Sequence, residues 1–286
     1  MINLALSIIF STAILILFRL LKPLAGSILQ VITINYLVAT LLGIATSEQS
    51  LSHGLMQWPA WTPIAIVLGF LFIATFFLFA RSSQQAGVAI TAVASRMSVL
   101  IPVLGGLLIF GEKAGISRLM GFALVFPAFY YTLYNGDSGK SVWYNRQALL
   151  PLALLLGTGL NDLLMNLATR AYAPVDLPFM LSIIFSISFL IGSAVLSISI
   201  IQSRLSFRLS LIPYGVLLGL INYASTYFLL RSMNQFDASL LFPVVNASIV
   251  FLAALVDISF FGHRPNRRQM AGMALALVAI VLISRG

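Results

Sequence analysis

The sequence predicts an all-α membrane protein whose ten transmembrane helices form two inverted five-helix repeats. Three observations support this fold class: the composition, a series of apolar segments, and a similarity between the two halves of the chain. Of the 286 residues, 60% are hydrophobic and 8% are charged, and the mean hydropathy is +1.04. A soluble domain carries roughly 25% charged residues, so this composition indicates a chain that lies mostly in lipid.

Apolar runs of about twenty residues follow one another along the whole chain. Each run is long enough to cross a hydrocarbon core of roughly 30 Å as a helix. The first run has neither a basic n-region nor a small-residue cleavage site, so we expect a retained helix and no cleaved signal. The ten predicted helices occupy residues 2–21, 27–46, 62–80, 87–111, 116–134, 148–170, 177–200, 211–232, 237–262 and 267–284.

The two halves resemble each other in sequence. LGFLFIATFFLFARSSQQ (68–85) aligns with LGLINYASTYFLLRSMNQ (218–235), and FGEKAGISRLMGFAL (110–124) aligns with FGHRPNRRQMAGMAL (261–275). The coincident Gly, Arg and Gln residues carry more weight than the leucines, which match by chance in apolar helices. We therefore predict a first repeat at 1–136, a connecting loop at 137–147 and a second repeat at 148–286.

An odd number of helices per repeat has a topological consequence. The second repeat must enter the membrane from the side opposite to the first. Inverted repeats with a binding site near the middle of the membrane are the common architecture of secondary transporters, in which one half rocks against the other.

The segment ASRMSVLIPVLGGLLIFGEKAGISRLMGFALVF (94–126) runs through the fourth and fifth predicted helices. With its Phe-Gly-Glu at 110–112, a basic residue after it and Gly121 beyond, it resembles the EamA-type repeat of the drug/metabolite transporter superfamily. The resemblance covers essentially the whole chain and implies a ten-helix carrier with its pathway among the central helices. The second half departs from the pattern, because His263 stands where the family has a glutamate. We therefore interpret Glu112 as a loop charge near the start of a helix, where the dipole favours an anion.

The basic residues predict an orientation. One set of loops carries ten of them: Arg19, Lys22, Arg81, Lys140, Arg146, Arg204, Arg208, Arg264, Arg267 and Arg268. The opposite set carries five: Lys113, Arg118, Arg170, Arg231 and Arg285. Because cytoplasmic loops are enriched in Lys and Arg, the count places both termini outside, whereas the family resemblance favours the cytoplasm.

Arg96 is the remaining basic residue, and it lies inside an apolar run. At about 1.5 Å per residue it is about 13 Å into the fourth helix. A charge facing lipid at that depth costs roughly 3 kcal/mol, so we expect Arg96 to face the bundle interior. It is either an anion receptor, because guanidinium binds carboxylate or phosphate through two parallel bonds, or a structural partner of Asp162 on the sixth helix.

Other polar residues at similar depth complete a predicted binding site. The predicted substrate-binding residues are Arg96, Asp162, Asn161, Asn222, Tyr223, Asn246 and Ser95. Asp162 is also the candidate carrier of a coupling proton. The asparagines and Tyr223 retain a second interpretation as interhelical hydrogen bonds. Pro102 and Pro243 are predicted to kink the fourth and ninth helices beside the cavity.

The predicted function is secondary transport of small polar metabolites, with amino acids or related carboxylate-bearing solutes as the substrate class. The alternatives are phosphorylated or nucleotide-linked sugars, cationic drugs, and, from another class, a non-transporting receptor or lipid-handling scaffold. The sequence lacks the motifs of hydrolases and of nucleotide-binding loops, and it has no cysteine. We therefore expect no enzyme activity, no cofactor, no metal and no nucleic-acid partner. The expected partners are the solute and membrane lipid, in a bacterial cytoplasmic (inner) membrane, as a monomer with a dimer left open.

Overall fold

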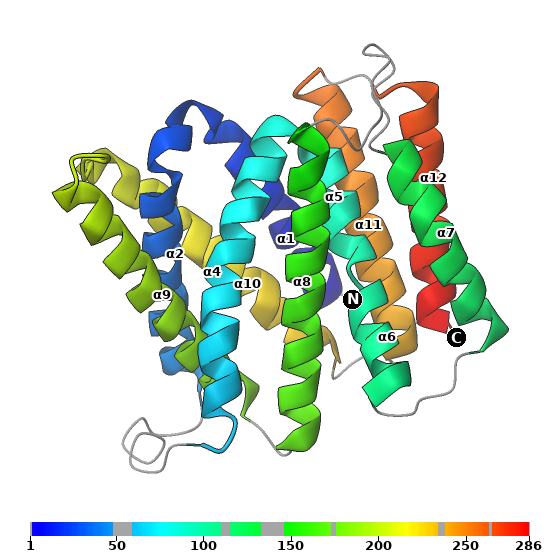
Figure 1. Cartoon of the computed structure of the whole chain (residues 1–286), viewed down its shortest axis with the longest axis horizontal. Coiled ribbons are helices and arrows are strands. Elements are labelled where there is room, and N and C mark those ends of the chain that lie inside the picture. The colour runs from blue at the N-terminus through cyan, green and yellow to red at the C-terminus, as the bar shows by residue number, and fades with distance from the viewer. Residues whose placement is uncertain are drawn as a thin grey trace. The chain divides into compact units, whose positions relative to one another are not determined.

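The computed structural model describes residues 2–47, 59–109, 115–132, 146–172, 176–233, 238–262 and 265–285, and within these ranges its regular structure is helical (Figure 1). The α-helices are α1 (Ile2–Leu20), α2 (Ile28–Thr46), α4 (Thr62–Gln85), α5 (Val88–Met97), α6 (Leu100–Ile109), α7 (Ile116–Thr132), α8 (Arg146–Ala171), α9 (Leu177–Ile201), α10 (Ile212–Met233), α11 (Ala238–Ser259) and α12 (Arg267–Arg285). Two short 3-10 helices, Lys22–Ser27 and Leu209–Leu211, precede α2 and α10. The predicted all-helical class is confirmed, and the fourth predicted helix is divided into α5 and α6.

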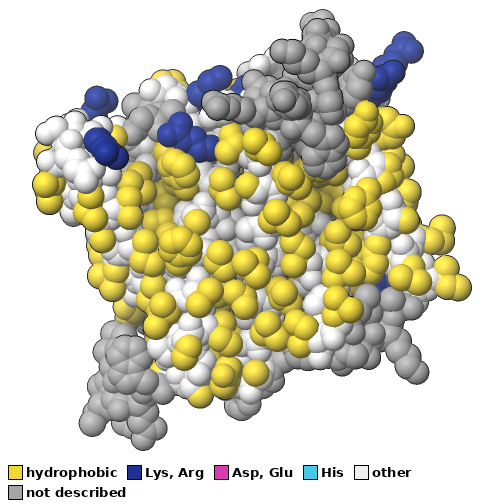
Figure 2. All heavy atoms as spheres, in the orientation of Figure 1, with side chains coloured by type: hydrophobic (Ala, Val, Ile, Leu, Met, Phe, Trp, Pro, Cys, Tyr) yellow, Lys and Arg dark blue, Asp and Glu magenta, His cyan; other side chains and the backbone are white. Residues whose placement is uncertain are grey.

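Seven stretches of the described helices are long and apolar enough to cross a membrane: Ile2–Leu20, Ile28–Thr46, Thr62–Gln85, Val88–Gly106, Leu149–Ala168, Pro178–Ile201 and Leu209–Leu229. Hydrophobic side chains also prevail on the helices in the face seen in Figure 2. Large apolar residues that would be anomalous on a soluble surface, such as Leu108 and Phe126, are exposed. The chain is therefore an integral membrane protein, while its ten-span count stays a prediction.

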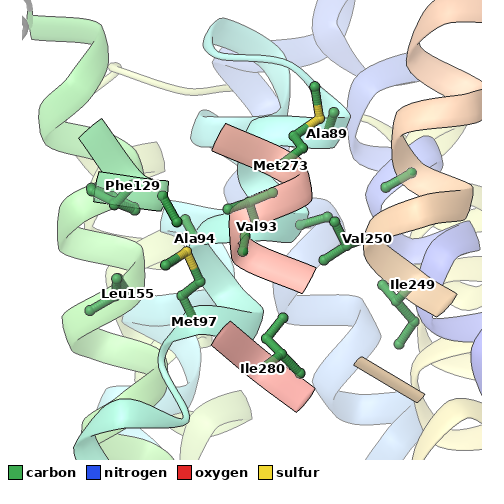
Figure 3. Packing of buried hydrophobic residues seen from close by; sticks show 14 of the residues in the cluster. Ala89, Val93, Ala94, Met97, Phe129, Leu155, Ile249, Val250, Met273 and Ile280 are labelled. Atoms are coloured by element: carbon green, nitrogen blue, oxygen red, sulfur yellow. The ribbon is translucent and has the colours of Figure 1, made fainter. Parts of the chain in front are cut away.

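The helices form two compact units, each of which combines segments from both predicted repeats. The first contains Met1–Lys22, Leu78–Leu163 and Ser225–Gly286. Its core surrounds α5, where Val93, Ala94 and Met97 pack among residues of α7, α8, α11 and α12, including Phe129 and Ile280 (Figure 3). Nine of the ten residues of α5 are buried, so this helix is held on all sides by apolar contacts.

Glycines bring α7 and α12 of this unit together in an antiparallel pair. A Cβ on Gly121 would lie 2.8 Å from the backbone nitrogen of Ile283, and a Cβ on Gly272 would collide with the backbone nitrogen of Thr132. The two contacts are reciprocal, because Gly272 follows Gly121 and Ile283 follows Thr132 by the same 151 residues. Small residues at these positions let the two backbones touch.

The second unit contains Pro23–Phe77 and Leu164–Ala224. Its α2 and α9 are also an antiparallel pair with reciprocal glycine contacts. Gly43 lies against Ser182, and Gly192 lies against Thr33, with 149 residues separating the equivalent positions. A core of Trp61, Leu68, Met180 and other apolar residues packs beside them. The predicted repeat boundary at 137–147 falls largely outside the described residues, and the division into repeats stays a prediction.

Candidate functional site

The candidate site is centred on the interruption between α5 and α6. The amide of Val99 donates to the carbonyl of Arg96 at 3.5 Å, and the amide of Ile101 donates to the carbonyl of Ser98 at 2.9 Å. In both bonds the acceptor lies three residues before the donor, whereas in an α-helix it lies four residues before it. Pro102 explains them, because it has no amide for the Ser98 carbonyl and its ring crowds that carbonyl. The helix is interrupted between α5 and α6, and Pro102 lies in the first turn of α6.

Arg96 lies in the last turn of α5, directly before the break. Its Nη1 donates a hydrogen bond to Oδ1 of Asn246 on α11 at 3.3 Å. Its Nε is buried and has no hydrogen-bond partner among the residues that the structure describes. A buried N–H donor without an acceptor is an unfavourable arrangement unless another acceptor joins it. Arg96 is therefore held by its hydrogen bond to Asn246, while its Nε–H lacks an acceptor among the described residues.

Asp162 lies on α8, close enough to Arg96 for the two opposite charges to attract each other. Glycine contacts account for its position. Gly159 of α8 lies against Ile101, and Gly105 of α6 lies against Leu163, so α6 and α8 approach closely beside the break. Arg96 donates its hydrogen bond to Asn246, and its attraction to Asp162 acts through space.

The exposed side chains of α8 divide into an apolar side and a polar side. Leu156 and Leu160 of α8 are 55% and 40% exposed and share one face of the helix. Asp162 is also exposed, but it follows Leu160 by two residues and so lies on roughly the opposite side. Thr158 shares that side, being one turn earlier, and its buried hydroxyl oxygen has no hydrogen-bond partner in the described part of the chain. Thr158 and Asp162 therefore form a polar side of α8 that is distinct from the apolar side of Leu156 and Leu160.

The remaining predicted site residues are Ser95 and Asn161, on α5 and α8, and Asn222 and Tyr223, on α10. The Ser95 hydroxyl donates to the Ala92 carbonyl of its own helix at 3.0 Å. Asn161 is buried on α8, beside Asp162 in sequence but about 100° away around the helix.

Asn222 and Tyr223 belong to the second unit. The Asn222 amide donates to Oδ1 of Asn35 at 3.2 Å, and the Tyr223 hydroxyl hydrogen-bonds to Thr46. These contacts match the interhelical interpretation of the two residues.

A second polar contact holds the other end of α5. Oδ2 of the buried Asp257 accepts a hydrogen bond from the amide of Ala89 at 3.2 Å, in the first turn of the helix. Gly87 precedes this turn with φ of +103°, a conformation that suits glycine. Beside it, Arg19 donates to the carbonyls of Ser83 and Gln84 at 3.1 and 2.7 Å, where α4 ends. The negative Asp257 thus lies at the N-terminal end of α5, which carries a partial positive charge. The positive Arg19 lies at the C-terminal end of α4, which carries a partial negative charge.

Several predictions fall on positions without described side chains. Glu112 and His263 lie outside the described residues, and of Pro243 only the helical backbone within α11 is described. In the described part of the chain, no group of three or more His, Cys, Asp or Glu residues could hold a metal ion.

The chain is similar to a known protein family, to a bacterial relative and to a solved structure. Residues 146–285 match the EamA-like transporter family. A Haemophilus influenzae protein named "Uncharacterized protein" is 24% identical over 296 aligned positions, which cover 97% of this chain and 96% of the relative. A solved structure titled "Crystal structure of protein" has a TM-score of 0.55 at 14% identity and covers 97% of this chain and 96% of its own. This last match shows a shared fold over nearly the whole chain.

Proposed function

Because residues 146–285 of this chain belong to the EamA-like transporter family, we propose that the protein is a secondary carrier of small polar solutes. The substrate class is amino acids or related carboxylate-bearing metabolites, and the membrane is the cytoplasmic membrane of a bacterium. Carriage proceeds by alternating access, in which two inverted repeats expose one site to each side in turn. No enzymatic step is part of this function.

The reciprocal helix contacts support the inverted repeats. In α7 with α12, and in α2 with α9, each contact recurs with the two helices exchanged, at an offset of 151 or 149 residues. Arg96 and Asn246 are 150 residues apart and touch each other across α5 and α11. Antiparallel helices that exchange contacts in this way are related by an approximate two-fold axis perpendicular to them. Such an axis lies in the membrane plane when the helices cross the membrane.

The incomplete satisfaction of Arg96 is the observation that carries the substrate class. Guanidinium has five N–H donors and binds a carboxylate through two parallel bonds. Among the residues that the structure describes, Nη1 is bonded to Asn246 and the buried Nε has no acceptor. A solute carboxylate would supply the missing acceptor. Asp162 is within electrostatic reach and would receive the solute amine or a coupling proton.

A phosphorylated or nucleotide-linked sugar is the second candidate, because the same guanidinium fork fits phosphate as well as carboxylate. A receptor or lipid-handling scaffold would also use a polar pocket but would move nothing across the membrane. A measurement of solute flux into proteoliposomes distinguishes a carrier from a receptor and from a lipid-handling scaffold.

The first test is thermal stabilisation of the detergent-purified protein by a panel of amino acids, sugar phosphates and amines. At a concentration a hundred times its Kd, a ligand adds ~2.7 kcal/mol to stability, which a melting curve detects. We expect a carboxylate-bearing solute to stabilise the wild type but not a folded Arg96→Ala. If Arg96→Ala melts far lower with or without ligand, the arginine is a structural element and the proposed substrate class is lost. Stabilisation by phosphates alone would favour the second candidate.

A further inference from the structure

An apolar groove lies between α1, α11 and α12 of the first unit. It has a volume of about 480 Å³ and is lined by, among others, Ile8 and Ile9 of α1, Ala247, Phe251 and Leu252 of α11, and Leu277 of α12. Ile9 and Phe251 are 54% and 60% exposed, so the groove is open on its outer side. Phe251 lies about 140° around α11 from Asn246, the partner of Arg96. The groove therefore faces lipid and is separate from the candidate site.

A difference between the two halves of the chain accounts for the groove. At an offset of 151 residues, which also relates the equivalent contacts of α7 and α12, Gly159 corresponds to Ile8 and Ile101 corresponds to Leu252. Gly159 lies against Ile101, because it has no side chain to hold α8 away from α6. Ile8 has a branched side chain at the corresponding place, so α1 and α11 cannot approach each other as closely there.

Positive charge is concentrated at one end of these helices. The guanidinium carbon of Arg19, in the last turn of α1, lies 5.7 Å from the ring centre of Phe261, shortly before α12. The end of α1 and the start of α12 are therefore neighbours. Lys22 and Arg267, which lie at these two helix ends, are both exposed. Because Asp257 near the end of α11 is 1% exposed, the exposed charges that the structure describes at this end of the three helices are positive.

The distance from this basic end to the groove suits a phospholipid. Leu277 follows Arg267 by ten residues of α12, which corresponds to about 15 Å. Met270 and Ala274, which lie between them on the same side of the helix, are exposed. Half of a hydrocarbon core of roughly 30 Å is also about 15 Å. An acyl chain whose headgroup is at Arg267 therefore reaches the groove near the middle of the bilayer.

We propose that the first unit binds an anionic phospholipid, with its phosphate at Lys22 and Arg267 and one acyl chain in the groove between α1, α11 and α12. Charge complementarity selects this ligand, because anionic headgroups attract Lys and Arg at the membrane surface and the arginine fork fits phosphate. Basic residues are enriched on the cytoplasmic side of a membrane protein, so the lipid belongs to the cytoplasmic leaflet. The site is independent of the solute and of Arg96.

The test compares two lipids that have the same chains and different headgroup charges. Dioleoyl phosphatidylglycerol and dioleoyl phosphatidylcholine are titrated into the purified protein in detergent, and native mass spectrometry counts the bound lipids. We expect the anionic lipid to bind at least about tenfold more tightly, because each base near an anionic surface raises the affinity roughly fivefold. The double variant Lys22→Gln with Arg267→Gln should lose this preference. Arg204→Gln removes an exposed base of the second unit and should keep it.

Two further comparisons test the chain in the groove. Ala247→Leu places a larger side chain in the groove and should weaken the binding of dioleoyl phosphatidylglycerol about tenfold. Ala123→Leu adds the same bulk at an exposed position of α7 and should have no effect. Dihexanoyl phosphatidylglycerol has the same headgroup with short chains, so it should bind weakly, and inorganic phosphate should not bind detectably. Melting curves establish that each variant is folded.

Equal affinity for the two dioleoyl lipids overturns the proposal, and so does full affinity in the double variant or in a folded Ala247→Leu. If Ala247→Leu fails to fold, the dihexanoyl lipid decides, because binding as tight as that of the dioleoyl lipid shows that no chain uses the groove. A dimer that is seen in the mass spectrum and lost in Ala247→Leu would assign the groove to a second copy of the chain and overturn the lipid site. Binding of inorganic phosphate with the affinity of the lipid would show a bare anion site and overturn it as well.

Discussion

Asp257 of α11 accepts a hydrogen bond from the amide of Ala89 at 3.2 Å, 168 residues away in the sequence. Asn246 lies eleven residues earlier on α11, close to three helical turns, and meets Arg96 at the other end of α5. One face of α11 therefore holds α5 at both its ends. The arginine owes its position to a helix fixed at its first turn as well as to its own hydrogen bond.

Removal of the Asp257 carboxylate should destabilise the protein. Asp257→Ala leaves the Ala89 amide buried without this acceptor, which costs about 1–3 kcal/mol. Asp257→Asn keeps a side-chain oxygen at the same place and should lose clearly less stability than Asp257→Ala. Melting temperatures of both variants in detergent test this order. Equal losses would mean that the charge matters and the hydrogen bond does not.

A carboxylate placed beside Arg96 should block the proposed receptor without unfolding the protein. Asn246→Asp puts a negative charge on the atom that now accepts from Arg96 at 3.3 Å. The guanidinium then has an internal partner, and we expect anionic solutes to lose their stabilising effect while the unliganded melting temperature is kept or raised. Arg96→Lys, which keeps the charge but not the fork, should weaken binding by about tenfold or more. Undiminished ligand stabilisation in Asn246→Asp would contradict a receptor role for Arg96.

The contact between α7 and α12 should not tolerate a side chain at Gly272. An alanine Cβ there meets the backbone nitrogen of Thr132, which cannot move aside alone. Overpacking of this kind costs typically about 1–3 kcal/mol. The comparison variant is Gly262→Ala, where nothing lies within 4 Å and only the positive φ of +63° opposes the change. A melting temperature for Gly272→Ala at or above that of Gly262→Ala would show that the two helices separate easily.

Replacement of Pro102 should separate stability from transport. Pro102→Ala restores an amide opposite the Ser98 carbonyl, so α5 and α6 can join into one helix. We expect the melting temperature to be unchanged or higher and the flux into proteoliposomes to fall severalfold, because the bend can no longer change. Normal flux in a folded Pro102→Ala would mean that the break is not used in the transport cycle.

The predicted orientation can be read from single cysteines in intact cells. Ile2 is 73% exposed at the start of α1, and Phe207 is 50% exposed between α9 and α10. Because the basic residues favour termini outside, Ile2→Cys should react with a membrane-impermeant thiol reagent and Phe207→Cys should not. The opposite pattern would place the termini in the cytoplasm.

The apolar runs predicted the helices well because burial in lipid demands length and composition more than particular residues. The first run, predicted at 2–21, is the helix Ile2–Leu20. Pro102 signalled a disturbance of the fourth run, but not that two helices result. That outcome depends on which carbonyls find other donors, such as the Ser98 hydroxyl for Ser95. A hydropathy pattern contains no such information.

The candidate site was predicted in part. Arg96, Asp162 and Asn246 were selected by depth in the membrane; Arg96 and Asn246 are hydrogen-bonded to each other, and the role of all three in binding stays a prediction. Ser98 and Thr158 were not in the predicted set, although Thr158 stands one turn before Asp162 and Ser98 stands four residues before Pro102. Asn222 and Tyr223 have the same depth signal, yet their contacts are to Asn35 and Thr46. Depth alone does not reveal which helix a side chain will meet.

The distance along the chain between paired helices has a consequence for how this protein is made. When the ribosome has completed α7, the glycine face that will receive α12 has no partner, because α12 is translated after it. In the same way, α2 cannot pack against α9 until α9 has been translated. The early helices must therefore remain in the bilayer with their glycine faces unpaired. A prematurely terminated product lacks the helices that would pack against these faces. If the two halves are expressed from separate messenger RNAs in one cell, we expect each half to stabilise the other by supplying its missing partner helices.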